Sequence, residues 1–157
     1  MSVAFRRESD EEHLEPRPEL PIPPGPNLVT ERGLRLIEAK VAELESRLAG
    51  GGDEAAVEAL RRELRYWHVR RATAQVTSAP ADADEAGFGT RVRFTQDGRE
   101  RSVDIVGDDE ADPATGRLSF TAPLARALTG AGEGDRVDFA GKAEALTILS
   151  VEPIPQG

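Results

Sequence analysis

The sequence predicts an α+β protein in which an N-terminal antiparallel helical hairpin (coiled coil) precedes a small antiparallel β domain with one short helix. Three observations predict this class. Apolar residues recur at helical spacing within 28–77 and alternate at a spacing of two over much of 88–157. Prolines, glycines and aspartates separate these regions. We therefore expect a tail (1–27), the hairpin (28–77), a linker (78–87) and the β domain (88–157).

Charge and composition exclude several classes of function. The 157 residues carry 29 acidic and 20 basic side chains, and the formal charge is −3 over 1–27, +1 over 28–77 and −7 over 78–157. This acidity argues against a primary duplex-DNA binder, which needs Lys and Arg on phosphates. Without cysteine there is no disulfide, thiolate nucleophile or cysteine-based zinc site. No apolar run approaches the roughly 20 residues that span a bilayer, so we expect a cytoplasmic protein that does not bind membranes.

The tail has six prolines and no apolar period. Proline lacks a backbone N–H and interrupts helices, so this composition favours an extended, solvated chain. We expect residues 1–27 to be disordered. The alternative is that the proline-rich stretch docks on a partner.

Two apolar series predict the helices of the hairpin. The first series, at spacings of three and four, is Leu34, Ile37, Val41, Leu44 and Leu48. The second, which weakens toward its end, is Val57, Leu60, Leu64, Trp67, Arg71 and Ala74. Thr30 and Asp53 are the expected N-caps, and the glycines at 50–52 let the chain reverse, so the helices lie antiparallel. A dimerisation coil or one half of a four-helix bundle fits the same pattern.

The β domain is predicted from alternation and turn signals. Asp97-Gly98 is a strong signal for a two-residue hairpin turn between two alternating segments. A short helix over 123–128, with Thr121 as cap and Gly130 as stop, interrupts the strands. The strands are expected at 90–95, 102–106, 118–120, 136–139 and 143–151.

Four motifs of this domain resemble the C-terminal domain of the bacterial Gre transcription elongation factors. In order, they are Ile105–Asp112, Leu118–Gly130, Gly134–Val137 and Leu149–Glu152. Upstream, Leu28–Leu36 and Leu64–Ala72 resemble the start and the return helix of the family's coiled coil. The resemblance implies an FKBP-like domain that seats at the rim of the RNA polymerase secondary channel while the helical hairpin points inward.

The resemblance also implies a role for the hairpin tip. In typical members two tip carboxylates, three residues apart, help to hold a second Mg²⁺ in the polymerase active site and promote cleavage of backtracked RNA. Hard oxygen ligands suit this cation. Here Asp53 matches the first position, but Ala56 follows three residues later, and the nearest substitutes are Glu54 and Glu58. Adjacent helical side chains diverge by about 100°, so Asp53 and Glu54 do not face one cation together, and capping is the plainer role for Asp53.

Other candidate residues have both a functional and a plain interpretation. The resemblance implies polymerase contacts for Asp108, Asp109, Glu110, Asp112, Pro123 and Arg126. The plain interpretation of the four acids is a solvated turn, because they lack the alternating ligands of a calcium loop.

The second helix is crowded with arginines, which are expected to form its wetted face or to meet acidic channel walls or RNA phosphate; they are Arg61, Arg62, Arg65, Arg70 and Arg71. Trp67 is expected in the core, and His68 has no second metal ligand at helical spacing.

We therefore expect a monomeric regulator that binds RNA polymerase and meets RNA or DNA only through the transcription complex. It is not expected to be an enzyme or to hold a cofactor of its own, beyond Mg²⁺ shared with the polymerase active site. Its hairpin is shorter than in typical members, and each residue removed from both arms retracts the tip by about 1.5 Å. Whether it stimulates cleavage therefore stays open. The alternative is a non-cleaving, channel-occupying inhibitor similar to the short-armed group called regulator of nucleoside diphosphate kinase.

Two further classes remain as alternatives. A coiled-coil adaptor would pair with itself through the apolar seam and would not bind polymerase. A prolyl isomerase would share the FKBP-like fold but would need an aromatic-lined pocket. The aromatic residues available to it are needed by the core; they are Phe88, Phe94, Phe120 and Phe139.

Overall fold

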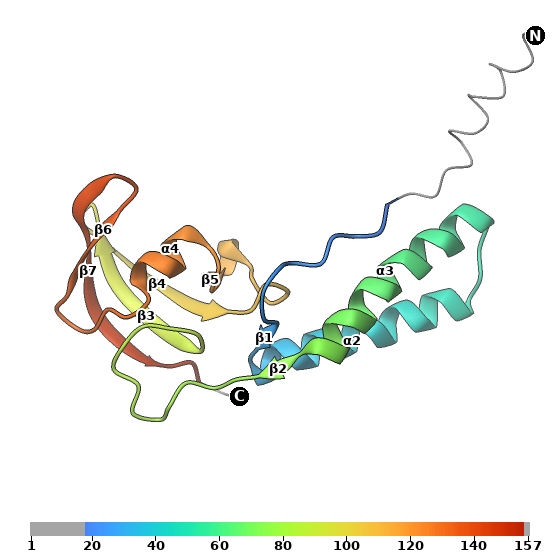
Figure 1. The fold of residues 1–157 in the computed structure, drawn as a ribbon, viewed down its shortest axis with the longest axis horizontal. Helices are drawn as coiled ribbons and strands as arrows, with labels where there is room; N and C mark the ends of the chain where they lie inside the picture. Colours follow the sequence, from blue (N-terminus) through green and yellow to red (C-terminus); the bar gives the residue numbers. More distant parts are fainter. Residues whose placement is uncertain (1–17, 156–157) are drawn as a thin grey trace, which may run out of the picture.

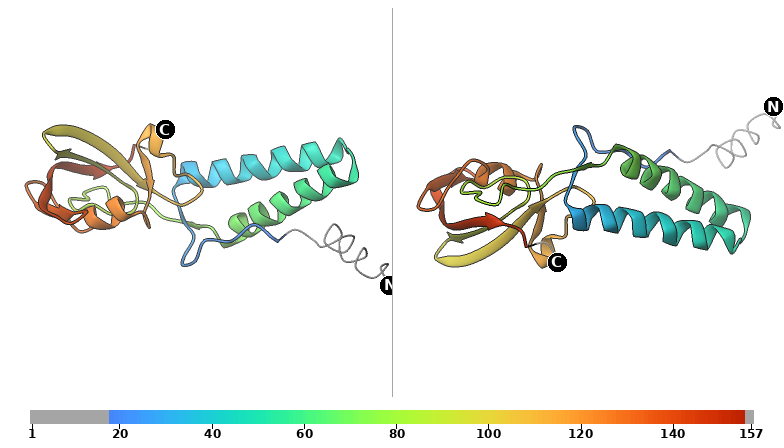
Figure 2. Two further views of the ribbon diagram at one scale, coloured as in Figure 1. Left: turned by 90° about the horizontal axis from the view of Figure 1, so that it is seen from above. Right: turned by 90° about the horizontal axis from the view of Figure 1, so that it is seen from below.

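A computed structural model describes residues 18–155 and confirms the predicted mixture of helices and sheet (Figure 1). A helical hairpin lies at one end of the molecule, and a five-stranded sheet with a short helix lies at the other. Figure 2 shows the hairpin projecting away from the sheet both from above and from below. Within the described residues, no helix combines the length and apolarity needed to cross a membrane.

The hairpin consists of α2 (Glu31–Ala49) and α3 (Glu54–Thr73). Both predicted caps are confirmed: the Thr30 and Asp53 side chains accept hydrogen bonds from the backbone N–H groups of Gly33 and Ala56. The chain reverses through Gly51 and Gly52, whose φ angles of 77° and 145° strain any other residue. At 1.5 Å per residue, the 19 residues of α2 make an arm of about 28 Å.

An apolar seam holds the two arms together. Ile37, Val41 and Leu44 are at most 1% exposed, and Leu60 and Leu64 of α3 are 8% exposed. Leu48 and Trp67 pack against the cluster formed by Val41, Leu44, Leu60 and Leu64, as the heptad spacing predicts.

Arg71 has the spacing of the seam but lies on the wetted face, as expected for the arginines of this helix, whereas Arg70 does not. Arg71 is exposed, whereas its neighbour Arg70 is 2% exposed. The seam therefore changes from apolar to ionic at the base of the hairpin, where Arg70 pairs with the carboxylates of Asp108 and Asp109.

A two-stranded parallel pair closes the base of the hairpin and was not predicted. It joins β1 (Leu28–Val29) to β2 (Gln75–Val76). The backbone N–H groups of Gln75 and Thr77 donate to the carbonyl oxygens of Asn27 and Val29, at 2.9 and 2.8 Å. Two-residue strands carry too little alternation to be recognised in a sequence.

The sheet of the C-terminal unit has the strand order β5-β4-β3-β7-β6. Its strands are β3 (Thr90–Gln96), β4 (Arg99–Val106), β5 (Arg117–Ser119), β6 (Arg136–Phe139) and β7 (Lys142–Pro153). Asp97 and Gly98 form the predicted turn, with φ angles of 52° and 77°. The prediction of a purely antiparallel sheet is wrong, because β5 pairs with β4 in parallel. The connection between them contains a 3₁₀ helix, η1 (Pro113–Thr115), which brings the chain back to run beside β4 in the same direction.

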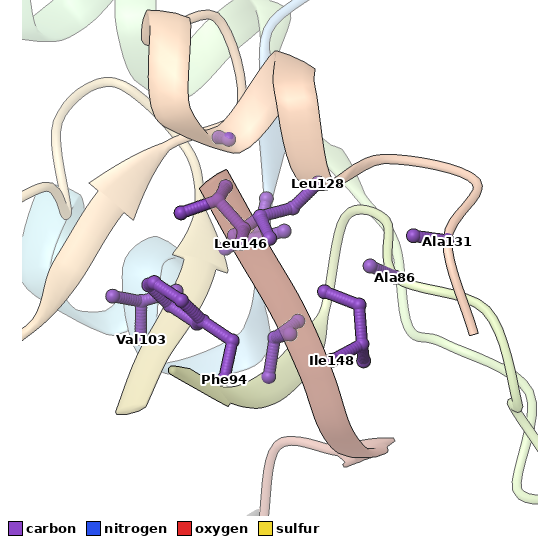
Figure 3. Packing of buried hydrophobic residues seen from close by; sticks show 10 residues of the cluster. Ala86, Phe94, Val103, Leu128, Ala131, Leu146 and Ile148 are labelled. Carbon is purple, nitrogen blue, oxygen red and sulfur yellow. The ribbon is translucent and has the colours of Figure 1, made fainter. Parts of the chain in front are cut away.

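The helix α4 (Pro123–Leu128) packs on the sheet and completes the core. Figure 3 shows Leu128 lying beside Leu146, and Phe94 beside Val103. The prediction that Thr121 caps α4 is wrong. The N-cap is Ala122, without a side-chain cap, and the Thr121 hydroxyl instead donates to Asp108.

The segments predicted as tail and linker both contact folded parts of the chain. Residues 1–17 of the expected disordered tail lie outside the described residues, but residues 18–27 run extended alongside α3 (Figures 1 and 2). In the segment predicted as a linker, Ala86 is 4% exposed and belongs to the core of the C-terminal unit. Its backbone N–H donates to the carbonyl oxygen of Ala131 at 2.8 Å.

The seam gives a matched stability test. Leu44→Ala removes a fully buried side chain and is expected to lower the free energy of unfolding by about 2–5 kcal/mol. Leu36→Ala makes the same change on the same helix at a side chain that is 39% exposed, and should cost less than about 1 kcal/mol. Urea unfolding followed by circular dichroism measures both. Equal losses would show that the seam does not hold the hairpin.

Candidate functional site

The tip of the hairpin presents Asp53 and Glu54, both exposed, where α3 begins. One carboxylate oxygen of Asp53, Oδ1, accepts a hydrogen bond from the backbone N–H of Ala56 at 2.8 Å. Ala56 occupies the position at which a second carboxylate would complete a pair. Among residues 18–155, no group of three or more histidine or acidic side chains is placed to hold a metal ion.

The acidic loop after β4, defined here as Asp108, Asp109 and Glu110, faces the base of the hairpin. Asp109 is the central member, and its side chain is 7% exposed. One oxygen, Oδ2, accepts from Arg70 Nε at 2.6 Å, and the other, Oδ1, accepts from the Tyr66 hydroxyl at 2.5 Å. Two residues of α3, one turn apart, thus converge on one carboxylate of the C-terminal unit.

Arg70 has buried partners on both sides. Its Nη2 donates to Asn27 Oδ1 at 2.8 Å and lies 3.8 Å from an Asp108 oxygen. Asn27 Nδ2 in turn donates to the carbonyl oxygen of Arg70 at 2.8 Å. Charge-assisted hydrogen bonds of this kind are the strong ones, and a buried charge is tolerated only when it is fully paired. Arg70 therefore ties α3, the segment before β1 and the acidic loop into one unit.

Glu110 fixes the other arm. Its side chain is 4% exposed, accepts from the Thr30 hydroxyl at 2.5 Å and pairs with Arg32 at 3.0 Å. Because Thr30 is the N-cap of α2, this carboxylate lies at the positive end of the helix dipole, where negative charge is stabilised.

Asp108 and Gly107 complete the contact from the side of the C-terminal unit. Asp108 Oδ1 accepts from the hydroxyls of Ser119 and Thr121 at 2.6 and 3.2 Å, so the loop is also tied to β5 and the start of α4. A side chain on Gly107 would collide with the carbonyl oxygen of Leu28. Only glycine lets the hairpin and the C-terminal unit approach this closely. We call Arg70, Tyr66 and the acidic loop the acidic junction.

The predicted polymerase-contact residues thus divide into two groups. Asp108, Asp109 and Glu110 come together at the acidic junction, where their carboxylates already have partners within the chain. Asp112, at the start of η1, and Pro123 and Arg126, on α4, are exposed. The prediction of a solvated turn for the acidic loop does not describe Asp109 and Glu110, which are buried by the hairpin.

Sequence reasoning missed the basic side of the acidic junction. The pattern of α3 places Arg70 among the arginines of the wetted face, but it is the largest fully buried side chain among the described residues. The sequence does contain a signal for a buried basic partner: the run Asp108-Asp109-Glu110 follows a buried strand, and carboxylates that become buried there need a positive charge beside them. The sequence does not indicate which of the nine basic residues between 28 and 77 provides this positive charge.

A second contact, away from the acidic junction, places residues 18–27 on α3. Glu19 forms a bidentate ion pair with Arg65. Arg65 Nε and Nη2 donate to the two Glu19 carboxylate oxygens at 2.5 and 2.8 Å, and these hydrogen bonds lower the pKa of Glu19. Leu20 and Ile22, next to this pair, help to line a pocket of about 450 Å³ with Tyr66 and other residues of α3. Both apolar side chains stay more than one third exposed.

Comparison with known proteins gives a family model and curated relatives that match part of the chain. Residues 81–153 match the family model for the transcription elongation factor GreA/GreB C-terminal domain. Transcription elongation factor GreB of Neisseria meningitidis is 46% identical over 74 residues, which is 45% of each chain. Transcription elongation factor GreA of Sinorhizobium medicae is 41% identical over 69 residues, or 41% of this chain and 44% of that one. The chain thus aligns with less than half the length of these curated relatives.

Solved structures give a weaker likeness over more of the chain. GreA factor homolog 1 (Gfh1) of Thermus thermophilus covers 82% of this chain and 99% of its own, with 18% identity and a TM-score of 0.38. A GreA/GreB factor from Nitrosomonas europaea gives the same four values.

Removing the buried cation tests the acidic junction. Arg70→Met is expected to lower the free energy of unfolding by about 3–5 kcal/mol, because it leaves Asp109 buried without its partner. Arg71→Met removes an exposed arginine next to it and should cost less than about 0.5 kcal/mol. Chemical denaturation compares the two variants. If Arg70→Met, Asp109→Leu were no more stable than Arg70→Met alone, the assigned pairing would be wrong.

The chain's single tyrosine gives the acidic junction a pH dependence. Burial, together with the hydrogen bond to Asp109, raises the pKa of the Tyr66 hydroxyl above its ordinary value of about 10. The unfolded chain therefore loses this proton at lower pH than the folded chain does. The resulting stabilisation is fully present below about pH 10 and is lost as the pH rises further, through the folded-state pKa.

Tyr66→Phe isolates this effect. Wild-type stability should fall more steeply than that of Tyr66→Phe as the pH is raised above about 10. Urea midpoints measured at a series of alkaline pH values give the two slopes. Parallel slopes would mean that the hydroxyl is not held by Asp109 in solution.

Proposed function

We propose that the chain is a regulator of transcription elongation that binds RNA polymerase, because residues 81–153 match the family model for the transcription elongation factor GreA/GreB C-terminal domain. In this proposal the C-terminal unit, which is FKBP-like in the Gre group, seats on the polymerase at the rim of the secondary channel. The chain is not itself an enzyme; it acts on the polymerase, in the cytoplasm, as a monomer. It meets RNA and DNA only within the transcription complex.

The shape of the molecule supports entry of the hairpin into the channel. The arm of about 28 Å projects from the C-terminal unit, and its base is held by the acidic junction rather than by a flexible linker. The formal charge is +1 over residues 28–77, which include the hairpin, and −7 over residues 78–157, so the projecting end is the less acidic of the two. A narrow projection with a fixed direction can enter a channel in a partner protein.

The exposed face around α4 is the proposed seat. Asp112, Pro123 and Arg126 are exposed and are available to a partner. Asp108, Asp109 and Glu110, for which the resemblance implies polymerase contacts, have carboxylates that already bind Ser119, Arg70 and Thr30 within the chain. We assign them the task of fixing the angle of the hairpin.

The hairpin tip decides between cleavage and blocking. Asp53 uses one carboxylate oxygen to cap α3, and its partner in that hydrogen bond, Ala56, stands where a second carboxylate is required. A lone, capping carboxylate holds a shared Mg²⁺ weakly. The proposal is therefore a regulator that occupies the channel with little or no stimulation of transcript cleavage.

The two other classes have less support. Pairing through the seam, as an adaptor requires, would need the hairpin to open, because Ile37, Val41 and Leu44 are already buried within the chain. For a prolyl isomerase, the aromatic residues are already used: Phe94 is fully buried, and Phe120 and Phe139 pack against the same core.

A cleavage assay tests the proposal. The chain is added with Mg²⁺ to a stalled, backtracked elongation complex, and shortened 3′ RNA is measured on a gel. We expect no robust cleavage and slower nucleotide addition. Asp53→Ala should change neither result, because the side chain contributes to the helix cap and not to chemistry.

Binding is established first by co-purification with core RNA polymerase. Ala56→Glu then serves as the gain-of-function control, since it places a second carboxylate one turn from Asp53. Robust cleavage by the wild-type chain that Asp53→Ala abolishes would overturn the blocking proposal. Failure to co-purify would overturn the polymerase proposal as a whole.

A further inference from the structure

The segment that precedes the hairpin lies along α3 as a strap, defined here as residues 18–26 (Figures 1 and 2). Its two ends are held differently. At the base of the hairpin the next residue, Asn27, is buried and exchanges hydrogen bonds with Arg70 in both directions. At the other end Glu19 pairs with Arg65, and both of these side chains are exposed. The strap is therefore fixed at the base of the hairpin and latched to α3 by an ion pair at the surface.

The strap is stiff and hinged near its fixed end. Its prolines set the backbone φ angle and have no N–H to donate; they are Pro18, Pro21, Pro23, Pro24 and Pro26. Within the described part of the chain, no backbone hydrogen bond joins the strap to α3. Gly25, with a φ angle of 85°, lies next to the fixed end, where a change in backbone angles swings the rest of the strap.

The contact between the strap and α3 is loose. Leu20 and Ile22 line the pocket of about 450 Å³ together with Val69 of α3, and all three side chains stay more than one third exposed. An ion pair between exposed side chains contributes little to stability, because salt screens it and two long side chains must be ordered. The closed strap is therefore held weakly enough to open without unfolding the hairpin.

The latch lies partway along the arm. Since α3 begins at Glu54, Arg65 lies about 17 Å from that end at 1.5 Å per residue, whereas the whole helix is about 30 Å long. From the latch to the base, the closed strap adds a third chain segment beside the two helices. An open strap leaves the arm two helices thick over its full length.

We propose that the strap is a releasable collar that sets how deeply the hairpin enters the polymerase channel. The closed strap thickens the arm between Arg65 and the base and stops entry there, and the open strap admits the full arm. The collar rests on the proposed function, whereas opening of the strap is a property of the isolated chain. If full entry needs the open strap, the measured dissociation constant is the intrinsic one divided by the open fraction.

Opening is tested on the isolated full chain by nuclear magnetic resonance. We expect nuclear Overhauser contacts between the methyl groups of Leu20 or Ile22 and those of Val69 at low salt. Glu19→Gln, or salt raised to about 0.5 M, should weaken these contacts at least about twofold. Glu38→Gln removes the same charge from an exposed position on α2 and should leave them unchanged. Contacts that stay equally strong in Glu19→Gln would overturn the latch, and their absence from the wild-type chain would overturn the closed strap.

Channel entry is then tested by the affinity of the same chains for core RNA polymerase. Glu19→Gln should bind about two- to fivefold more tightly, because no ion pair has to be broken, and Glu38→Gln should stay within about 1.5-fold of the wild type. A Glu19→Gln chain that opens without binding more tightly would overturn the collar and leave the proposed function intact. If none of the chains binds polymerase, both the proposed function and the collar fail, while the contacts in the isolated chain still decide the latch.

The depth of the tip separates the collar from a simple gain of charge attraction. The chain has no cysteine, so Ala55→Cys carries a single photo-crosslinker near the tip. Crosslinks from this position to the 3′ end of the RNA in a backtracked complex should increase when Glu19→Gln is added. Tighter binding with an unchanged crosslink yield would overturn the collar, because the arm would then bind better without entering more deeply.

Discussion

The buried contact between Arg70 and Asp109 sets the geometry of the whole molecule. The hairpin and the C-terminal unit each have their own apolar core, and neither core extends into the other. What fixes one against the other is polar: Arg70 and Tyr66 on Asp109, and Thr30 and Arg32 on Glu110. Polar contacts need defined directions and distances. They therefore specify one angle between the hairpin and the C-terminal unit, which an apolar patch of the same size would leave less well defined.

This arrangement also explains why the seam of α3 changes character along its length. Nearer the tip, Leu60 and Leu64 are buried against α2, where packing depends only on how well the apolar side chains fit together. At the base, the same helix meets a loop of three carboxylates, and Arg70 is buried there in place of an apolar residue. Burying these charges costs desolvation that an apolar pair would not, so the acidic junction contributes specificity of orientation more than stability. The close approach at Gly107 serves the same end, because it brings the loop within reach of Arg70.

Much of the fold was predictable from the sequence, because local rules suffice for it. The heptad spacing around Leu44, the caps Thr30 and Asp53, and the Asp97-Gly98 turn each depend on neighbours within one or two turns of chain. The predictions that failed concern residues whose partners are distant in the sequence. Local spacing predicts a cap of α4 at Thr121, yet that side chain binds Asp108, and β5 pairs in parallel because of the path of the 108–116 connection. The seam spacing of α3 falls on Arg71 and not on Arg70, and only the position of Asp109 explains why Arg70 is the one that is buried.

The same geometry bears on what a short hairpin can do. A tilt of about 5° at the base moves the end of an arm of about 28 Å by roughly 2.4 Å. Positioning a metal ligand for catalysis tolerates about 1 Å or less, so a cleaving factor needs both a rigid base and a tip of the right length with two carboxylates. Filling a channel needs only the rigid base and the volume of the arm. This chain has the rigid base at Arg70 and Glu110, while the tip has a single capping aspartate followed by Ala56. The hydrogen bonds that set the direction of the hairpin are thus concentrated at its base, and the tip offers few groups for chemistry. This distribution agrees with the proposed occupancy of a channel.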